Sequence, residues 1–152
     1  MEQYREQIER YSNYYEKQGF SPVAARVMIY LFLHPEGEAT FDEIQAYFNV
    51  SKSAVSNALR LLSAMQIVTE RTKSGERKRY FKASLQVLFS PEAVIKNYRD
   101  TRHIIEEILV LRNKQDTASQ QLEDIVSLIK VIETEFPKLY KKALGKKQGK
   151  EA

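Results

Sequence analysis

Cysteine is absent from this 152-residue chain, and no apolar run approaches the roughly 20 residues that a membrane-spanning helix needs. The first absence excludes disulfides, thiolate metal sites and cysteine redox switches, and it allows a reducing compartment. The first residues alternate charged and aromatic side chains, without the apolar segment of a signal peptide. We therefore expect an untargeted, cytoplasmic protein with no membrane anchor.

Motifs of catalysis are missing as well. The chain has no glycine-rich phosphate loop, no Gly-x-Ser-x-Gly and no carboxylate cluster in a recognisable setting. His34 and His103 are the only histidines, and neither has a ligand spacing such as His-x3-His, although glutamates lie near both. The sequence therefore predicts no catalytic residue, no metal site, no cofactor and no enzymatic function.

Residues 52–66 contain no acidic side chain, although 29% of the chain is charged and its formal net charge is only +4. Positions three and four apart share one face of a helix, so Val55, Ala58, Leu59 and Leu62 are predicted to face inward. The outward set is small, polar and basic, as expected of a helix that approaches base edges and phosphates. It consists of Lys52, Ser53, Ser56, Asn57 and Arg60, with Ser51 as the predicted N-cap.

A basic hairpin follows this helix. Strand-like stretches over residues 67–72 and 77–82 flank a tip at residues 73–76, where Gly75 supplies an unusual backbone angle. Six bases stand against the single acid Glu76, namely Arg71, Lys73, Arg77, Lys78, Arg79 and Lys82. Arg77 and Arg79 are predicted to share a strand face, with Lys78 opposite. Phosphate contact explains such charge, and a solvated basic hairpin without a ligand is the alternative.

The remaining elements are predicted to be helical. A first helix ends at Gly19, Ser21 and Pro22 begin a second, nearly all-apolar helix for the centre of the core, and Thr40 and Glu43 form a capping box for a third. Two long amphipathic helices follow, the first after Ser90 and the second kinked or divided by Pro137. We predict a DNA-binding domain over residues 1–89, a helical dimerisation region over 90–145 and a disordered basic tail over 146–152.

The chain resembles bacterial and archaeal regulators of the MarR superfamily, and within it the GbsR-like branch. The resemblance rests on Gly19-Phe20-Ser21-Pro22 with Arg26 before the second helix, and on a Ser-Lys-x-x-Val-Ser-x-x-Leu-Arg-x-Leu pattern. That pattern is matched at Ser51, Lys52, Val55, Ser56, Leu59, Arg60 and Leu62. Specific motifs cover roughly residues 1–85, and the rest is matched only by its helical pattern.

The expected fold is mainly α with a small β-hairpin wing, a winged helix-turn-helix core with long C-terminal dimerisation helices. The resemblance implies a homodimer, paired through the N-terminal helix and residues 90–145, that binds double-stranded DNA as a transcriptional repressor or activator. Asn57 and Arg60 are predicted to read bases, while Lys52, Ser53, Ser56 and the wing residues Lys73, Arg77, Lys78 and Arg79 hold the backbone. A winged-helix module that binds RNA or protein stays open as the alternative.

A small-molecule effector is a further hypothesis. Aromatic side chains near the expected junction of core and dimer helices could enclose a quaternary ammonium by cation-π attraction, and Tyr11, Tyr15, Tyr30 and Tyr98 are the candidates. Such stripes at helical spacing are also typical of a packed core without a ligand, and that interpretation is favoured.

Overall fold

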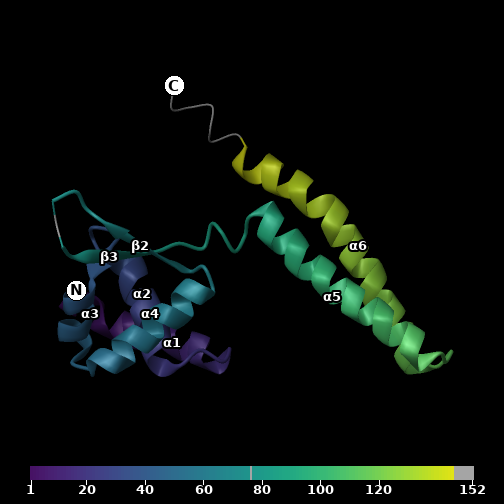
Figure 1. Cartoon of the computed structure of the whole chain (residues 1–152), viewed down its shortest axis with the longest axis horizontal. Helices are drawn as coiled ribbons and strands as arrows, with labels where there is room; N and C mark the ends of the chain where they lie inside the picture. Colours follow the sequence, from purple (N-terminus) through teal and green to yellow (C-terminus); the bar gives the residue numbers. More distant parts are fainter. Residues whose placement is uncertain (76, 146–152) are drawn as a thin grey trace. The chain divides into compact units, whose positions relative to one another are not determined.

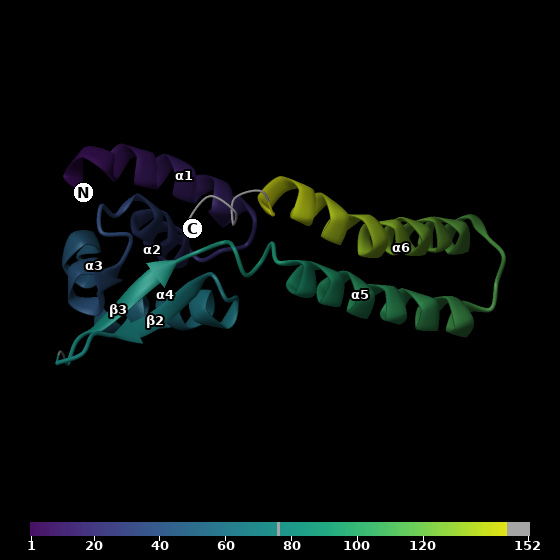
Figure 2. The same ribbon diagram turned by 90° about the horizontal axis from the view of Figure 1, so that it is seen from above.

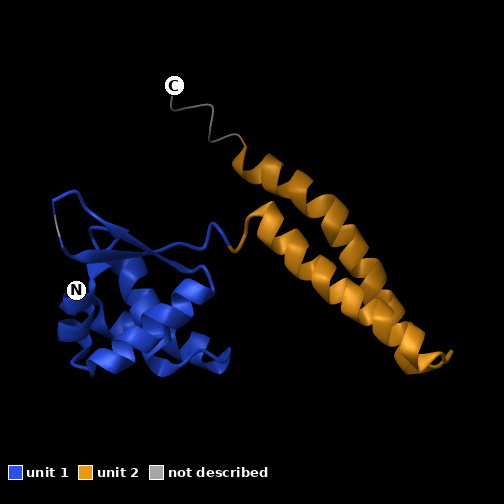
Figure 3. Ribbon diagram, viewed as in Figure 1, with its two compact units in different colours: residues 1–87 blue, residues 88–152 orange. Residues whose placement is uncertain are grey.

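The computed structural model describes residues 1–75 and 77–145. The chain divides into two compact units, unit 1 (Met1–Val87) and unit 2 (Leu88–Ala152), which are coloured separately in Figure 3. The tail predicted over residues 146–152 lies outside the described residues. Across residues 1–75 and 77–145, no helix combines the length and the apolar character that crossing a bilayer requires.

Unit 1 begins with a short 3-10 turn, η1 (Glu2–Tyr4), and contains four helices (Figure 1). They are α1 (Arg5–Lys17), α2 (Pro22–Leu33), α3 (Phe41–Phe48) and α4 (Lys52–Ala64). Helix α2 packs against both α1 and α4. Its side chains are buried almost all round, from Ala24 to Leu31 apart from Arg26, so the central position predicted for this helix is confirmed.

Side-chain caps define where two of these helices begin. The Ser21 hydroxyl accepts a hydrogen bond from the Ala24 amide at 3.3 Å, and Pro22 opens α2. At α3, Thr40 and Glu43 form the predicted capping box: the Thr40 hydroxyl accepts from the Glu43 amide at 3.3 Å, and a Glu43 carboxylate oxygen accepts from the Thr40 amide at 2.7 Å. Both starts are therefore fixed by local sequence.

The sheet has one strand more than predicted. It consists of β1 (Ala39–Thr40), β2 (Val68–Thr72) and β3 (Arg79–Ala83), antiparallel and in the order β1-β3-β2. Ala39 pairs with Phe81, and Thr40 pairs with Tyr80. The prediction of a hairpin alone was incomplete because a two-residue strand is too short to show an alternating pattern. The β2-β3 hairpin projects beyond the helices of unit 1 (Figures 1 and 2).

The two faces of the sheet have different environments. Phe81 is buried in the core beside its strand partner Ala39, whereas Tyr80 is half-buried on the opposite face. Of the two aromatic residues on β3, only Phe81 is therefore part of the core. With α3, the turn after it and α4, the hairpin makes unit 1 a winged helix-turn-helix, and the predicted fold class is correct.

Unit 2 is a helical hairpin of α5 (Pro91–Arg112) and α6 (Thr117–Leu144), which pack against each other along their length (Figures 1 and 2). The Ser90 hydroxyl caps α5 by accepting from the Ala93 amide at 3.2 Å, as its sequence predicted. Asn113 ends α5 in the left-handed conformation. Helix α6 continues through Pro137, so it is not divided there.

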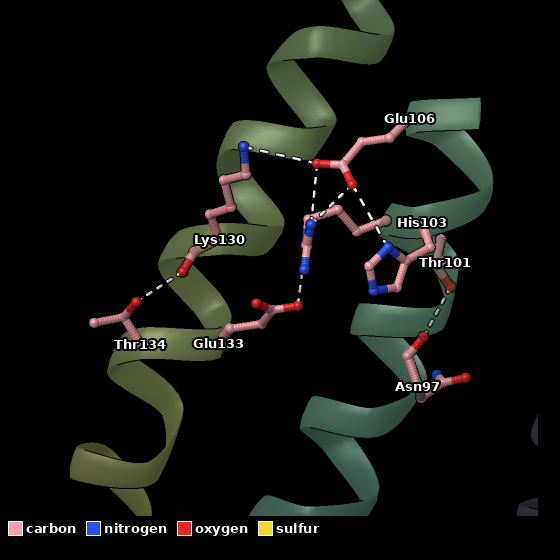
Figure 4. Close-up of polar contacts among 8 residues, drawn as sticks. Asn97, Thr101, His103, Glu106, Lys130, Glu133 and Thr134 are labelled. Carbon is pink, nitrogen blue, oxygen red and sulfur yellow. Dashed lines mark hydrogen bonds and ion pairs between the residues drawn. The ribbon is translucent and has the colours of Figure 1, made fainter. Parts of the chain in front are cut away.

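A polar network ties α5 to α6 (Figure 4). Arg102, whose side chain is only 16% exposed, lies with its Nη1 atom 2.8 Å from Glu106 on its own helix and its Nε atom 3.3 Å from Glu133 on α6. Lys130 of α6 approaches Glu106 at 3.7 Å, and the arginine lowers the pKa of the Glu106 carboxyl. Because a guanidinium that is largely shielded from solvent needs partners for its donors, this cluster favours one register of the two helices.

Candidate nucleic-acid interface

Helix α4 follows a tight turn in which Asn49 adopts the left-handed conformation that ends α3. The Ser51 hydroxyl accepts from the Ala54 amide at 3.2 Å, so the predicted N-cap is confirmed. The four apolar side chains predicted to face inward are buried, namely Val55, Ala58, Leu59 and Leu62. The outward set is exposed as predicted: Ser51, Lys52, Ser53, Ser56, Asn57 and Arg60.

Asn57 and Arg60, the two predicted base readers, contact each other. Arg60 Nη2 donates to Asn57 Oδ1 at 3.3 Å, as expected for residues one turn apart. This bond holds the guanidinium near the outer side of α4 and uses the amide oxygen as an acceptor. A substitution at either position therefore changes the environment of the other.

A hollow of about 270 Å³ lies between α4 and the sheet. Ser56, Arg60 and Ser63 line it from the helix, while Glu70 of β2 and Arg79 of β3 line it from the strands. Arg79 Nη1 lies 3.4 Å from both carboxylate oxygens of Glu70. The hollow therefore contains one acid and two arginines beside α4, and the sequence had suggested no role for Glu70.

The wing differs from its prediction in one respect. Strand β3 begins at Arg79, so Arg77 and Lys78 precede the strand, and the prediction that Arg77 and Arg79 share a strand face was wrong. Arg77 and Lys78 do not pair with β2, because the pairing of β3 with β2 starts at Arg79, opposite Thr72. All three bases are exposed, and Gly75 has the positive φ of 81° predicted for the tip.

Glu38, in the loop before β1, contacts the wing, and the sequence did not reveal this contact. Its carboxylate receives two hydrogen bonds from Arg71, from Nε at 2.6 Å and from Nη2 at 2.7 Å, and Lys73 Nζ lies 3.0 Å away. The Arg71 hydrogen bonds lower the pKa of Glu38 to about 2, and Lys73 adds to the effect. Because Glu38 lies outside the hairpin segment, the charges within that segment alone overstate the positive charge of the wing.

The basic side chains of the wing thus lie on two faces. Arg79 lies beside α4 with Glu70, whereas Arg71 and Lys73 gather on the other face with Glu38 and Tyr80. Lys73 Nζ also lies 3.9 Å from the centre of the Tyr80 ring. A single phosphate-binding surface would need its bases on one side, and the alternation of a strand separates them.

The four candidate effector tyrosines are not one cluster of rings within unit 1. Tyr30 is buried against Tyr47 and Phe48, with ring centres 4.8 and 5.5 Å away, and burial raises its pKa to about 12. Tyr15 packs against Phe20, and Tyr11 is exposed. Tyr98 belongs to unit 2. Tyr30 therefore favours the packed-core interpretation, and an effector site at these residues stays a prediction.

The histidines have ordinary polar and aromatic contacts. His34 packs its ring against Tyr30 at 5.5 Å, and His103 Nδ1 lies 3.7 Å from Glu106. Over the described part of the chain, histidine and carboxylate side chains do not gather in groups of three or more that could hold a metal ion.

Comparisons with known proteins return no matching family model and no matching curated protein. Among solved structures, the chain is similar to a protein described only as a transcriptional regulator, at 18% identity over 94% of this chain and 96% of the other, with a TM-score of 0.74. Two further structures have lower TM-scores. They are the transcriptional regulator Tm0710 from Thermotoga maritima (17% identity, 86% and 89% covered, TM-score 0.45) and a mutant of Lactococcus lactis ZitR in apo form (17%, 86% and 96%, 0.40). The first of these likenesses shows that the chain shares its fold with that regulator over nearly its whole length.

Proposed function

We propose that this chain is a transcriptional regulator that binds double-stranded DNA sequence-specifically as a homodimer and acts as a repressor. The GbsR-like branch of the MarR superfamily is its proposed place. One observation carries the proposal: the exposed side of α4 has no acid from residue 52 to residue 66 and shares a hollow with Arg79 of the wing. A solvated surface helix more often carries both acids and bases, whereas a helix that binds a polyanion is expected to lack acids on its contact side.

In the proposed complex α4 enters the major groove. Asn57 and Arg60 contact base edges, since an amide pairs with adenine and a guanidinium with guanine. Lys52, Ser53 and Ser56 approach the sugar-phosphate backbone, and Ser51 contributes chiefly as the cap of the helix. The wing adds backbone contacts from Arg77, Lys78 and Arg79, with Lys73 at the hairpin tip.

The apolar surface of unit 2 supports the homodimer. Ile104, Ile108 and Leu111 recur on α5 at spacings of four and three residues, and 58%, 40% and 83% of their surfaces are exposed. Ile125, Leu128 and Val131 continue this pattern on α6, where they are also exposed. A second copy of the same hairpin can cover this surface in a bundle of four helices. Each copy in such a dimer would contact one half-site, so the operator is expected to be pseudo-palindromic.

An RNA-binding function has less support. Single-stranded RNA is read by exposed aromatic rings that stack on bases. Phe81 is buried, and the half-buried Tyr80 already has Lys73 over its ring. A purely protein partner leaves the acid-free side of α4 unexplained.

Selection of random duplexes on the purified protein tests the proposal. We expect enrichment of an inverted repeat whose affinity falls steeply between two salt concentrations, because bound phosphates release counterions. Single-stranded RNA of matched length is the control. A folded dimer that enriches no duplex, or that prefers the RNA, would overturn the proposed function.

A further inference from the structure

Glu38 forms a clasp with Arg71 and Lys73 on the outer face of the sheet. The Glu38 side chain is only 6% exposed, although it lies in the loop before β1, far from the hairpin in sequence. Arg71 holds the carboxylate with both Nε and Nη2, at 2.6 and 2.7 Å, and Lys73 adds its ammonium at 3.0 Å. Two parallel hydrogen bonds from one guanidinium fix an angle as well as a distance.

The clasp joins the wing to the start of the helix-turn-helix. Glu38 is two residues before Thr40, which pairs with Tyr80 in the sheet and caps α3. Lys73 follows the last residue of β2 and places its Nζ 3.9 Å from the Tyr80 ring centre on β3. The cluster therefore connects the loop before β1 with β2, through Arg71, and with β3, through Lys73 and Tyr80.

This position suits a mechanical role. A two-stranded hairpin is only marginally stable in water by itself, and its tip needs an anchor to keep one orientation. The strand β1 supplies just two residues of pairing to β3. Simple charge neutralisation would not require burial, since an exposed glutamate could do it, whereas a buried carboxylate is tolerated only when its partners are held in place.

We infer that Glu38 is a positioning residue that sets the orientation of the wing relative to α4, and so determines sequence discrimination at the base pairs beneath the wing. The inference rests on the proposed function and adds to it a residue that does not itself contact DNA. Arg71 transmits the restraint through its paired hydrogen bonds, and Lys73 extends it to the hairpin tip.

Three variants of the chain distinguish the geometric role of Glu38 from the effect of its negative charge. Glu38→Gln removes the clasp and one negative charge. Glu36→Gln removes the same charge from an exposed side chain two residues earlier and serves as the matched control. Arg71→Lys keeps the charge and loses the two-pronged geometry, because an ammonium cannot donate in a fixed fork. Circular dichroism establishes that each variant is folded, and Arg71→Lys carries the test if Glu38→Gln is not.

The measurement is the ratio of affinities for the selected duplex and for duplexes changed at single base pairs. For Glu38→Gln and Arg71→Lys we expect discrimination to fall about tenfold at the flanking positions beneath the wing, the order of one base pair of recognition. Positions read by Asn57 and Arg60 should keep their discrimination. Hydrogen exchange of the free protein should also be faster in the β2-β3 hairpin of both variants, with α4 unchanged.

Two results would overturn the inference. One is that Glu38→Gln behaves like Glu36→Gln, with all duplexes bound more tightly by the same factor, which assigns Glu38 to charge alone. The other is that Arg71→Lys keeps full discrimination at the flanking positions. If the unaltered protein selects no duplex at all, the proposed function fails first and this inference fails with it.

Discussion

Arg60 and Arg79 line the same hollow beside α4, yet their polar partners differ. Arg60 donates to the neutral amide of Asn57, whereas Arg79 lies 3.4 Å from the Glu70 carboxylate. A neutral partner leaves the full charge of Arg60 available for a base edge. In the proposed complex Arg79 must exchange a carboxylate for a phosphate, which reduces the net gain from binding DNA. The two arginines are therefore expected to contribute differently to affinity and to specificity.

Arg60→Ala should reduce discrimination between the selected duplex and single-base variants by about 1–3 kcal/mol at one position of each half-site. Arg79→Ala should weaken all duplexes similarly and lower the slope of log affinity against log salt by about 0.9 for each phosphate that the arginine neutralises. Fluorescence titrations at several salt concentrations measure both quantities. If neither variant differs from the unaltered protein, the face assigned to DNA is wrong.

The Glu38 clasp predicts a defined pH dependence of stability. The pKa of the Glu38 carboxyl in the folded protein is about 2, below its ordinary value of 4.5. The ionised carboxylate therefore stabilises the fold fully above pH 4.5, and this contribution is lost as the pH falls toward 2. The difference in unfolding free energy between the unaltered protein and Glu38→Gln should stay constant from neutral pH to about pH 5.5 and shrink below about pH 4.5. Urea denaturation across this range measures it, with Glu36→Gln as the control. A difference that already changes near pH 7 would contradict the assignment.

At the scale of elements, local signals predicted helix starts well and missed what depends on distant partners. Ser21, Thr40, Ser51 and Ser90 cap their helices as expected, because an N-cap bonds an amide three residues later in the same segment. Strand β1 was missed, since it has two residues and its partner in β3 lies about 40 residues further on. The contact of Glu38 was missed for the same reason, since its hydrogen-bond partner Arg71 is 33 residues away.

Helix α4 offers a test of this local control. Ser51→Ala removes the side-chain acceptor for the Ala54 amide and should lower the free energy of unfolding by about 1 kcal/mol. Ser63→Ala, at the exposed last turn of the same helix, should have a much smaller effect, because alanine is a strong helix former there. Thermal and urea unfolding of both variants provide the comparison. Equal effects would mean that Ser51 is not the residue that fixes the start of α4.

For the molecule as a whole, charge and apolar surface are divided between the two units. The bases assigned to DNA all belong to unit 1, while the most exposed apolar side chains, Val110 and Leu111, belong to unit 2. Exposed apolar surface of this kind marks an interaction site more often than it marks ordinary solvent contact. This division agrees with the proposed function, in which unit 1 binds a nucleic acid and unit 2 binds a second copy of the chain.

Leu111→Glu should convert the proposed dimer to a folded monomer, because a carboxylate on the exposed apolar surface of α5 would have to be buried in the interface without a partner. Gln120→Glu adds the same charge at an exposed polar position of α6 and should leave the dimer intact. Analytical ultracentrifugation gives the mass of each. The monomer should bind a full inverted repeat no more tightly than a half-site. A variant that remains dimeric would remove this surface from the interface.

The carboxylate that balances Arg71 and Lys73 of the wing is outside the hairpin, and this limits how the wing can be transferred to another protein. Because Glu38 comes from a segment before α3, the hairpin cannot be transplanted as residues 68–83 alone. A chimera that received only this stretch would carry Arg71 and Lys73 without their carboxylate. Such a graft would gain two uncompensated cations per chain and bind nucleic acids indiscriminately. An exchange of wings between related proteins must therefore transfer two segments together, namely the loop before β1 and the β2-β3 hairpin.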